Sequence, residues 1–318
     1  MTKRSIAAFL FAALVPLYAC QAHNATAPAP QGTSALLTPE IGGIKQVVQI
    51  TTDDPGKPVL LFLSGGPGSS MMNNAASYTN ILRERFTIVQ WDQRDAGKTF
   101  KLNPSPVQPS VALMERDTFE VIEFLRKELK QEKIYLLGSS WGNVLGFQMV
   151  RNHAHLLHAY FAVNPVVSQL ASEKELLATL KTHFAEDSVA SAELAKVNIP
   201  FKNDEDLLYL RKWLFYKEGK KQVTSNEFRT GFLHWSKNWS PVWNEVMNID
   251  LPKTLGRVEI PIYFFVGKND IQTSTRITTE YYERLRAPKK GLFSFENSGH
   301  QIHHDEPEKF QQALLRAL

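Results

Sequence analysis

Residues Lys133–Gly146 read KIYLLGSSWGNVLG, an apolar run, a turn of small residues and a second apolar run. Within this stretch, Gly138–Gly142 fits the G-x-S-x-G pattern of a strained turn between a strand and a helix. The glycines let strand and helix approach without Cβ clashes, so the central hydroxyl projects above the sheet edge. Ser140 is therefore the candidate nucleophile, because Ser139 lies one position too early. The next residue, Trp141, can offer its backbone N–H to an oxyanion. The alternative interpretation of the whole motif is a tight turn with a structural role only.

A serine at neutral pH is a weak nucleophile and needs a base, normally an imidazole that a carboxylate orients. After this kind of turn, the acid and then the histidine are expected just past later strands. The run PIYFFVGKND places Asp270 after one strand-like segment, and GLFSFENSGH places His300 after the next. Asp270 would fix the ring tautomer, and His300 would take and return the proton. The competing interpretation of Asp270 is a turn or helix-cap carboxylate; its neighbour Asn269 lacks the charge.

The tract HQIHHD, residues 300–305, permits a metal-site interpretation. It would require His300, His303, His304 and Asp305 to converge, and their spacing matches no metal-ligand motif. We therefore expect no metal here, with His303 and His304 at the surface or the rim of a pocket.

A second glycine-rich turn follows the strand-like run in LFLSGGPGSS. Its exposed backbone N–H groups, those of Gly65 and Gly66 above all, could face a substrate carbonyl. Losing one such oxyanion donor typically costs about 10²–10³ in rate. The alternative interpretation is an ordinary glycine turn.

Strand-like and helical patterns alternate from residue 37 to 168 and again from 251 to 318, which predicts an α/β fold with a doubly wound, mostly parallel sheet. Examples are the buried-strand runs VLLFL and FTIVQW and the amphipathic segment ERDTFEVIEFLRKEL. Between 169 and 250 only helical patterns occur. We expect this segment to form a cap over the edge of the sheet where such folds bind ligands.

Five motifs in order, SGGPGSS, WDQRDAGKT, GSSWG, VGKND and SGH…DEPEKF, resemble those of the proline iminopeptidase group of α/β-hydrolases. The resemblance implies an eight-stranded core, a helical cap between the sixth and seventh strands, no cofactor, and hydrolysis through an acyl-enzyme. Many members release an N-terminal residue, often proline, from small peptides, and others are esterases or amidases. The alternatives are thus a carboxylesterase or lactone hydrolase with the same triad, or a non-catalytic hydrolase-like binding protein.

Two positions depart from that family's pattern: Ser64 replaces the usual His, and Asp95 replaces the usual Gly. Asp95 could attract a substrate amine or be a solvated turn residue, and the second interpretation is favoured. In the family, cap carboxylates pair with the substrate ammonium. Glu173 in SEKELL is the weak candidate for that role, beside Glu175, with helix-surface glutamates as the simpler interpretation.

The N-terminus reads as an export signal, 1–19, with a basic start and an apolar run too short to span a bilayer comfortably. The lone cysteine, Cys20, follows LYA and resembles a lipidation site; cleavage after Ala27 is the alternative. Residues 20–36 would be a flexible tether. We therefore expect a membrane-anchored lipoprotein on the periplasmic or cell-surface side, otherwise a periplasmic or secreted protein.

Composition sets few further limits on the 318-residue chain, since 43% apolar and 21% charged residues are ordinary for a globular protein. Without Lys3 and Arg4 of the signal, the net charge of +4 falls to +2, too little to suggest nucleic-acid binding. A peptide or ester substrate is the expected partner, and the sequence leaves the oligomeric state open.

Overall fold

A computed structural model describes residues 33–318 of the chain. Its centre is an eight-stranded sheet in the order β1-β4-β6-β5-β7-β8-β9-β10. β1 and β4 pair antiparallel to their neighbours, and all pairs from β6 to β10 are parallel. The strands are β1 (Thr33–Leu37), β4 (Val47–Thr52), β5 (Val59–Leu63), β6 (Thr87–Asp92), β7 (Ile134–Ser139), β8 (Leu157–Val163), β9 (Ile262–Gly267) and β10 (Lys290–Phe295), with a separate β2 (Glu40–Ile41) and β3 (Ile44–Lys45) pair.

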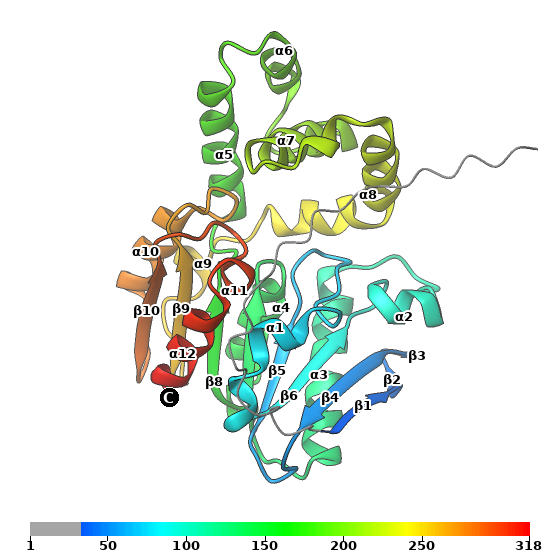
Figure 1. Cartoon of the computed structure of the whole chain (residues 1–318), viewed down its shortest axis with the longest axis vertical. Coiled ribbons are helices and arrows are strands. Elements are labelled where there is room, and N and C mark those ends of the chain that lie inside the picture. Colours follow the sequence, from blue (N-terminus) through cyan, green and yellow to red (C-terminus); the bar gives the residue numbers. More distant parts are fainter. Residues whose placement is uncertain (1–32) are drawn as a thin grey trace, which may run out of the picture. The chain divides into compact units, whose positions relative to one another are not determined.

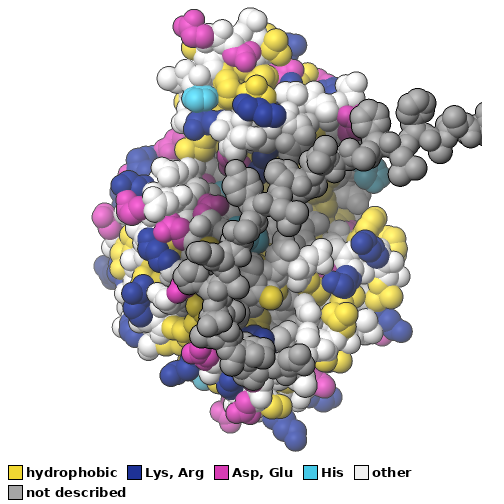
Figure 2. All heavy atoms as spheres, in the orientation of Figure 1, with side chains coloured by type: hydrophobic (Ala, Val, Ile, Leu, Met, Phe, Trp, Pro, Cys, Tyr) yellow, Lys and Arg dark blue, Asp and Glu magenta, His cyan; other side chains and the backbone are white. Residues whose placement is uncertain are grey.

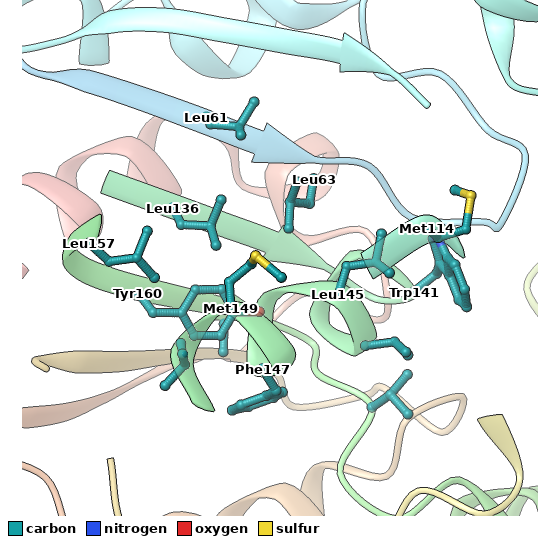
Figure 3. Packing of buried hydrophobic residues seen from close by; sticks show 14 of the residues in the cluster. Leu61, Leu63, Met114, Leu136, Trp141, Leu145, Phe147, Met149, Leu157 and Tyr160 are labelled. Atoms are coloured by element: carbon teal, nitrogen blue, oxygen red, sulfur yellow. The ribbon is translucent and has the colours of Figure 1, made fainter. Parts of the chain in front are cut away.

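Helices cover both faces of the sheet, as its buried strands require. In β5, Leu61 and Leu63 pack into one hydrophobic cluster with α3 and α4, and Leu60 and Phe62 pack into another with α1 and α12. Figure 3 shows part of the first cluster, where β5 and β7 side chains lie alongside those of α4. The core helices are α1 (Ala75–Thr79), α2 (Gly97–Leu102), α3 (Val111–Glu128), α4 (Gly142–Asn152), α9 (Leu251–Thr254), α10 (Thr275–Arg284), α11 (Ile302–Asp305) and α12 (Pro307–Ala317), with 3₁₀ turns at Leu82–Glu84 and Ala154–Leu156. A third 3₁₀ turn, Lys221–Thr224, lies in the segment between β8 and β9. The predicted doubly wound α/β fold is confirmed.

The segment between β8 and β9, the sixth and seventh strands of the large sheet, forms a cap of four helices. They are α5 (Gln169–His183), α6 (Ser188–Lys196), α7 (Asp204–Lys217) and α8 (Asn226–Val246). Leucines of α5, α6 and α7 share a hydrophobic cluster of their own, whereas α8 packs into the core cluster through Trp239, Val242 and Trp243. Figure 1 shows the cap above the ends of the central strands. Its two ends meet, because Ser168 and Asp250 form an antiparallel bridge.

The predicted tether, residues 20–36, ends too late. Thr33–Leu37 form β1, which pairs with β4 in the register Thr33↔Thr52. The strand escaped prediction because four of its five residues are exposed, so no buried face imposes an alternating pattern. The predicted export signal and Cys20 lie outside the described residues.

Charged side chains of both signs occur, interspersed, on the one face that Figure 2 displays. Among residues 33–318, no helix combines the length and apolar character needed to cross a bilayer.

Candidate active site

Ser140 lies in the sharp turn between the end of β7 and the start of α4. Its backbone is left-handed, with φ 51°, and its N–H donates to the carbonyl of Val163 at 3.0 Å. The flanking glycines are required sterically. A Cβ on Gly138 would lie 2.4 Å from Tyr160 Oη, and one on Gly142 would lie 2.1 Å from the Leu63 carbonyl oxygen. The turn therefore holds Ser140 in a strained conformation that the surrounding packing enforces.

The structure brings the three predicted catalytic side chains together although they lie far apart in the chain. Ser140 Oγ is 2.8 Å from His300 Nε2, and His300 Nδ1 is 2.8 Å from Asp270 Oδ2. All three residues are buried. Because its Nδ1–H donates a hydrogen bond to the carboxylate, the imidazole presents the Nε2 lone pair to the serine hydroxyl.

Asp270 follows β9, and its carboxylate is held in the ionised state. Burial raises its pKa, but the positive charge that His300 carries when protonated and hydrogen bonds from His300, Thr273 and the Gln272 backbone outweigh burial, so the pKa lies below its ordinary value. Thr273 Oγ1 donates to Oδ2 at 2.8 Å, and the Gln272 N–H donates to Oδ1 at 2.7 Å. The carboxylate can therefore orient the ring and stabilise an imidazolium.

Asn164, directly after β8, connects two segments of the site, and its sequence context did not single it out. Its side-chain amide donates to the His300 carbonyl at 2.8 Å and accepts from the Gly267 N–H at 2.9 Å. The side chain thus joins the end of β9 to the His300 loop. Only its place after a strand-like run could have indicated this role.

The glycine-rich loop after β5 lies directly beside the nucleophile. A Cβ on Gly65 would come within 3.4 Å of Ser140 Cβ, and Gly66 has φ 122°. Within the described part of the chain, no hydrogen bond occupies the N–H groups of Gly65, Gly66 or Trp141. These three donors therefore remain free for an oxyanion formed at Ser140.

A match to the family model described as the alpha/beta hydrolase fold covers residues 58–307, most of the chain. The chain belongs to the α/β-hydrolase fold family. This α/β-hydrolase is 28% identical over 305 residues to a probable aminopeptidase, YbaC, of Bacillus subtilis, covering 87% of this chain and 93% of the relative. It is 23% identical to a proline iminopeptidase of Heyndrickxia coagulans, covering 85% and 93% of the two chains.

Solved structures support the same fold assignment. A proline iminopeptidase-related protein of Thermus thermophilus matches with TM-score 0.62 at 20% identity, covering 90% of this chain and 97% of the other. Proline iminopeptidase of Mycobacterium smegmatis matches with TM-score 0.63 at 18% identity, covering 89% and 97%. At these identities the likeness concerns the fold alone.

The α/β-hydrolase has a cavity of about 510 Å³ that reaches Ser140 and His300. Cap residues form an aromatic wall, and the loops after β5 and β10 form a more polar wall. The aromatic wall includes Phe215, Phe232, Trp235 and Trp243; the polar wall includes Ser69, Ser70, Asn73, Asn74, Gln301, His303 and His304. The cavity is of the size expected for a small-molecule or short-peptide site.

The cap also holds the glycine-rich loop from above. Trp235 of α8 donates its indole N–H to the Pro67 carbonyl at 3.0 Å. Trp239 packs so closely on Gly68 that a Cβ there would lie 2.6 Å from the indole nitrogen. These contacts leave no sign in the local sequence, because the loop that the tryptophans contact lies about 170 residues earlier.

Glu173, the candidate for binding a substrate amine, is fully buried and paired. Its carboxylate accepts hydrogen bonds from both terminal nitrogens of Arg211. The side-chain amide of Gln169 donates a further hydrogen bond to it at 2.6 Å. Arg211 lines the cavity, and Glu173 lies behind it rather than among the lining residues. Its neighbour Glu175 instead accepts from Ser274 Oγ at 2.6 Å, which joins α5 to the segment after Asp270.

The two departures from the family pattern lie outside the cavity lining. Ser64 is buried, and within residues 33–318 its hydroxyl has no hydrogen-bond partner. Asp95 has φ 55° and accepts a hydrogen bond from the Ser105 N–H at 2.7 Å. Asp95 thus stabilises a turn through its own side chain.

His303 lines the cavity, within the range of positions expected for it, but its ring is buried and packs against Tyr78 and Phe310. The Tyr78 and His303 ring centroids are 5.0 Å apart and the planes are nearly perpendicular. Burial, with the nearby His304 and His300, lowers the pKa of His303 to about 3. A neutral imidazole therefore borders the cavity at physiological pH.

Proposed function

We propose that this α/β-hydrolase is a serine hydrolase that acts through an acyl-enzyme, most closely an aminopeptidase of the proline iminopeptidase type. The observation that carries the proposal is the hydrogen-bonded series Ser140–His300–Asp270 at the base of the cavity. The curated relatives named aminopeptidase or proline iminopeptidase support the finer assignment.

The proposed reaction follows from this geometry. Ser140 Oγ attacks the substrate carbonyl carbon while His300 Nε2 takes the hydroxyl proton. The carbonyl oxygen becomes an oxyanion that the free N–H groups beside Ser140 stabilise. His300 then gives the proton to the leaving amine or alcohol, which departs and leaves an ester on Ser140. A water molecule, activated by the same imidazole, hydrolyses that ester and restores the serine.

The same groups would hydrolyse an ester or lactone, so the substrate must be decided at the cavity wall. An aminopeptidase needs an anionic group to pair with the substrate ammonium. Among the residues that line the cavity, the acidic one is Glu218. Its Oε2 lies 3.0 Å from Lys220 Nζ, so this carboxylate is paired with a lysine. The role predicted for Glu173 stays a prediction, with its carboxylate already paired to Arg211. A carboxylesterase or lactone hydrolase is accordingly the second candidate.

A fluorophosphonate probe and a substrate panel test the proposal in two stages. The wild type should form a covalent adduct at Ser140, and Ser140→Ala should not. Ser139→Ala is the matched control, since it removes the same hydroxyl one position earlier and should still be labelled. An unlabelled wild type would exclude the serine mechanism, and an adduct at any other residue would assign the nucleophile differently.

The panel compares prolyl and other aminoacyl arylamides with their N-acetylated forms and with short-chain aryl esters. An aminopeptidase should cleave the free-amine arylamides and lose most of that activity on N-acetylation. Turnover of the aryl esters alone would favour the esterase. Binding of substrate without any turnover would indicate the non-catalytic alternative.

We also propose that the protein is exported and carries a lipid on Cys20, as the N-terminal sequence predicts. In a bacterial host, the full chain should incorporate labelled fatty acid and partition with membranes. The Cys20→Ala variant should do neither. Labelling that persists in this variant would place the lipid elsewhere.

A further inference from the structure

Gln93 joins the two segments that supply the candidate oxyanion donors. It follows β6 and exposes only 1% of its surface. Its Oε1 accepts from the indole N–H of Trp141 at 3.0 Å, and its Nε2 donates to the Ser64 carbonyl at 3.3 Å. One amide therefore contacts the residue after the nucleophile and the residue before Gly65.

The chemistry of the neighbours fixes how this amide is oriented. An indole N–H can only donate and a backbone carbonyl can only accept, so the oxygen of Gln93 must face Trp141 and its NH₂ must face Ser64. A glutamate could not donate to the carbonyl, and a hydrophobic side chain could do neither. Among side chains of this length, glutamine satisfies both neighbours.

The sheet order explains why such a bridge is needed. β5 lies between β6 and β7, so the glycine-rich loop and the Ser140 turn leave the sheet from adjacent strands. In the described chain, no backbone hydrogen bond joins Gly65 or Gly66 to Trp141. The bridge through Gln93 therefore constrains the distance between the donors, and oxyanion donors act only within a narrow range of distance.

We propose that Gln93 is a positioning residue that fixes the separation between the two groups of oxyanion donors, those of the glycine-rich loop and that of Trp141. It touches no substrate and acts through Trp141 and Ser64. This inference rests on the proposed serine hydrolase function and adds to it a residue that supports the transition state from outside the cavity. Because the donors bind the oxyanion more tightly than the ground-state carbonyl, the effect belongs to kcat rather than to KM.

The test uses Gln93→Met, which keeps the side-chain length and removes both hydrogen bonds. We expect kcat to fall by about 10–100-fold, below the loss for removing one donor outright, with KM changed less than about 3-fold. Trp141→Phe removes the same indole hydrogen bond and keeps the backbone donor, so it should lower kcat in the same direction. The double variant should be no slower than the slower single variant.

Gln90→Met is the matched control, because Gln90 is a buried glutamine on β6 and, among the described residues, no hydrogen bond joins its side chain to either oxyanion segment. It should retain wild-type kcat. A second readout is inhibition by a trifluoromethyl ketone, whose tetrahedral adduct places an oxyanion at the same site. In Gln93→Met and Trp141→Phe, the Ki of the ketone should rise by the same factor by which kcat/KM falls. A purely structural role would not produce this correlation.

The outcomes separate this inference from the function on which it rests. A wild type that no fluorophosphonate labels would overturn both. A labelled wild type, with Gln93→Met and Trp141→Phe both retaining kcat and ketone affinity, would overturn the role of Gln93 alone. Should Gln93→Met fail to fold, Trp141→Phe decides the matter. Equal losses in Gln90→Met would also overturn the proposal, because they would reflect general damage to β6.

Discussion

Replacing His303 with phenylalanine should remove a defined part of the protein's sensitivity to acid. Burial and two neighbouring histidines lower the pKa of His303 from 6.5 to about 3. In the unfolded chain the same imidazole titrates at its ordinary value, so on acidification the unfolded state binds this proton first. The stabilising contribution of neutral His303 is therefore complete above the ordinary pKa and is lost progressively as the pH falls towards 3.

The magnitude follows from the size of the pKa difference. Between about pH 7 and about pH 5, the wild type should lose about 2 kcal/mol of unfolding free energy through this side chain alone. Phenylalanine has a similar ring and can keep the contacts with Tyr78 and Phe310. Urea unfolding across this range should show a wild-type midpoint that falls about 0.7–1 M further than that of His303→Phe, for a slope of about 2–3 kcal/mol/M.

His183→Phe provides the control, because His183 is an exposed residue at the end of α5. The same substitution there should leave the wild-type pH dependence in place. If the unfolding free energy of His303→Phe followed the wild type within about 0.5 kcal/mol from pH 7 to 5, burial would not hold this imidazole neutral, and the reasoning would be wrong.

Three further changes probe the site. Asp270→Asn should lower kcat by about 10³–10⁴ because the ring loses the partner that fixes its tautomer; steady-state kinetics showing less than about a 10-fold loss would contradict this. Trp235→Phe removes the hydrogen bond to the Pro67 carbonyl, and losing a bond worth about 0.5–1.5 kcal/mol should slow turnover about 3–10-fold; an unchanged rate would show that the cap does not support this loop. Gly142→Ala should destabilise the fold by at least about 1–3 kcal/mol, because its Cβ would lie 2.1 Å from the Leu63 carbonyl oxygen; wild-type stability on thermal unfolding would refute the close packing.

The sequence predicts those parts of the molecule where burial imposes a strong pattern. β5 and β7 are buried nearly throughout, so they read as continuous apolar runs, and the motifs that follow them lie at the same sheet edge. Ser140 follows β7 and Asp270 follows β9, another buried strand, so the sequence alone aligns both with strand ends. The structure then brings both side chains within hydrogen-bond distance of His300.

Features that depend on contacts between distant segments could not be predicted. β1 is exposed on an edge, and its pairing with β4 leaves no mark on its own composition. Glu173 is an ordinary helix glutamate until folding places Arg211, 38 positions later, against it. His303 belongs to a polar tract, and only its packing against Tyr78 makes it a buried imidazole.

The cap's two ends meet at Ser168 and Asp250, so the whole cap is inserted into the core at one place. The Leu251 N–H also donates to the Val167 carbonyl at 2.9 Å, so the two chain segments that connect the cap to the sheet lie side by side and are hydrogen-bonded. An exchanged or shortened cap would therefore need ends that lie close together, as these two segments do. Evolution, or a protein engineer, can thus introduce new selectivity between β8 and β9 while the reacting groups, all supplied from outside the insert, keep their places, as long as α8 keeps its contacts with the glycine-rich loop.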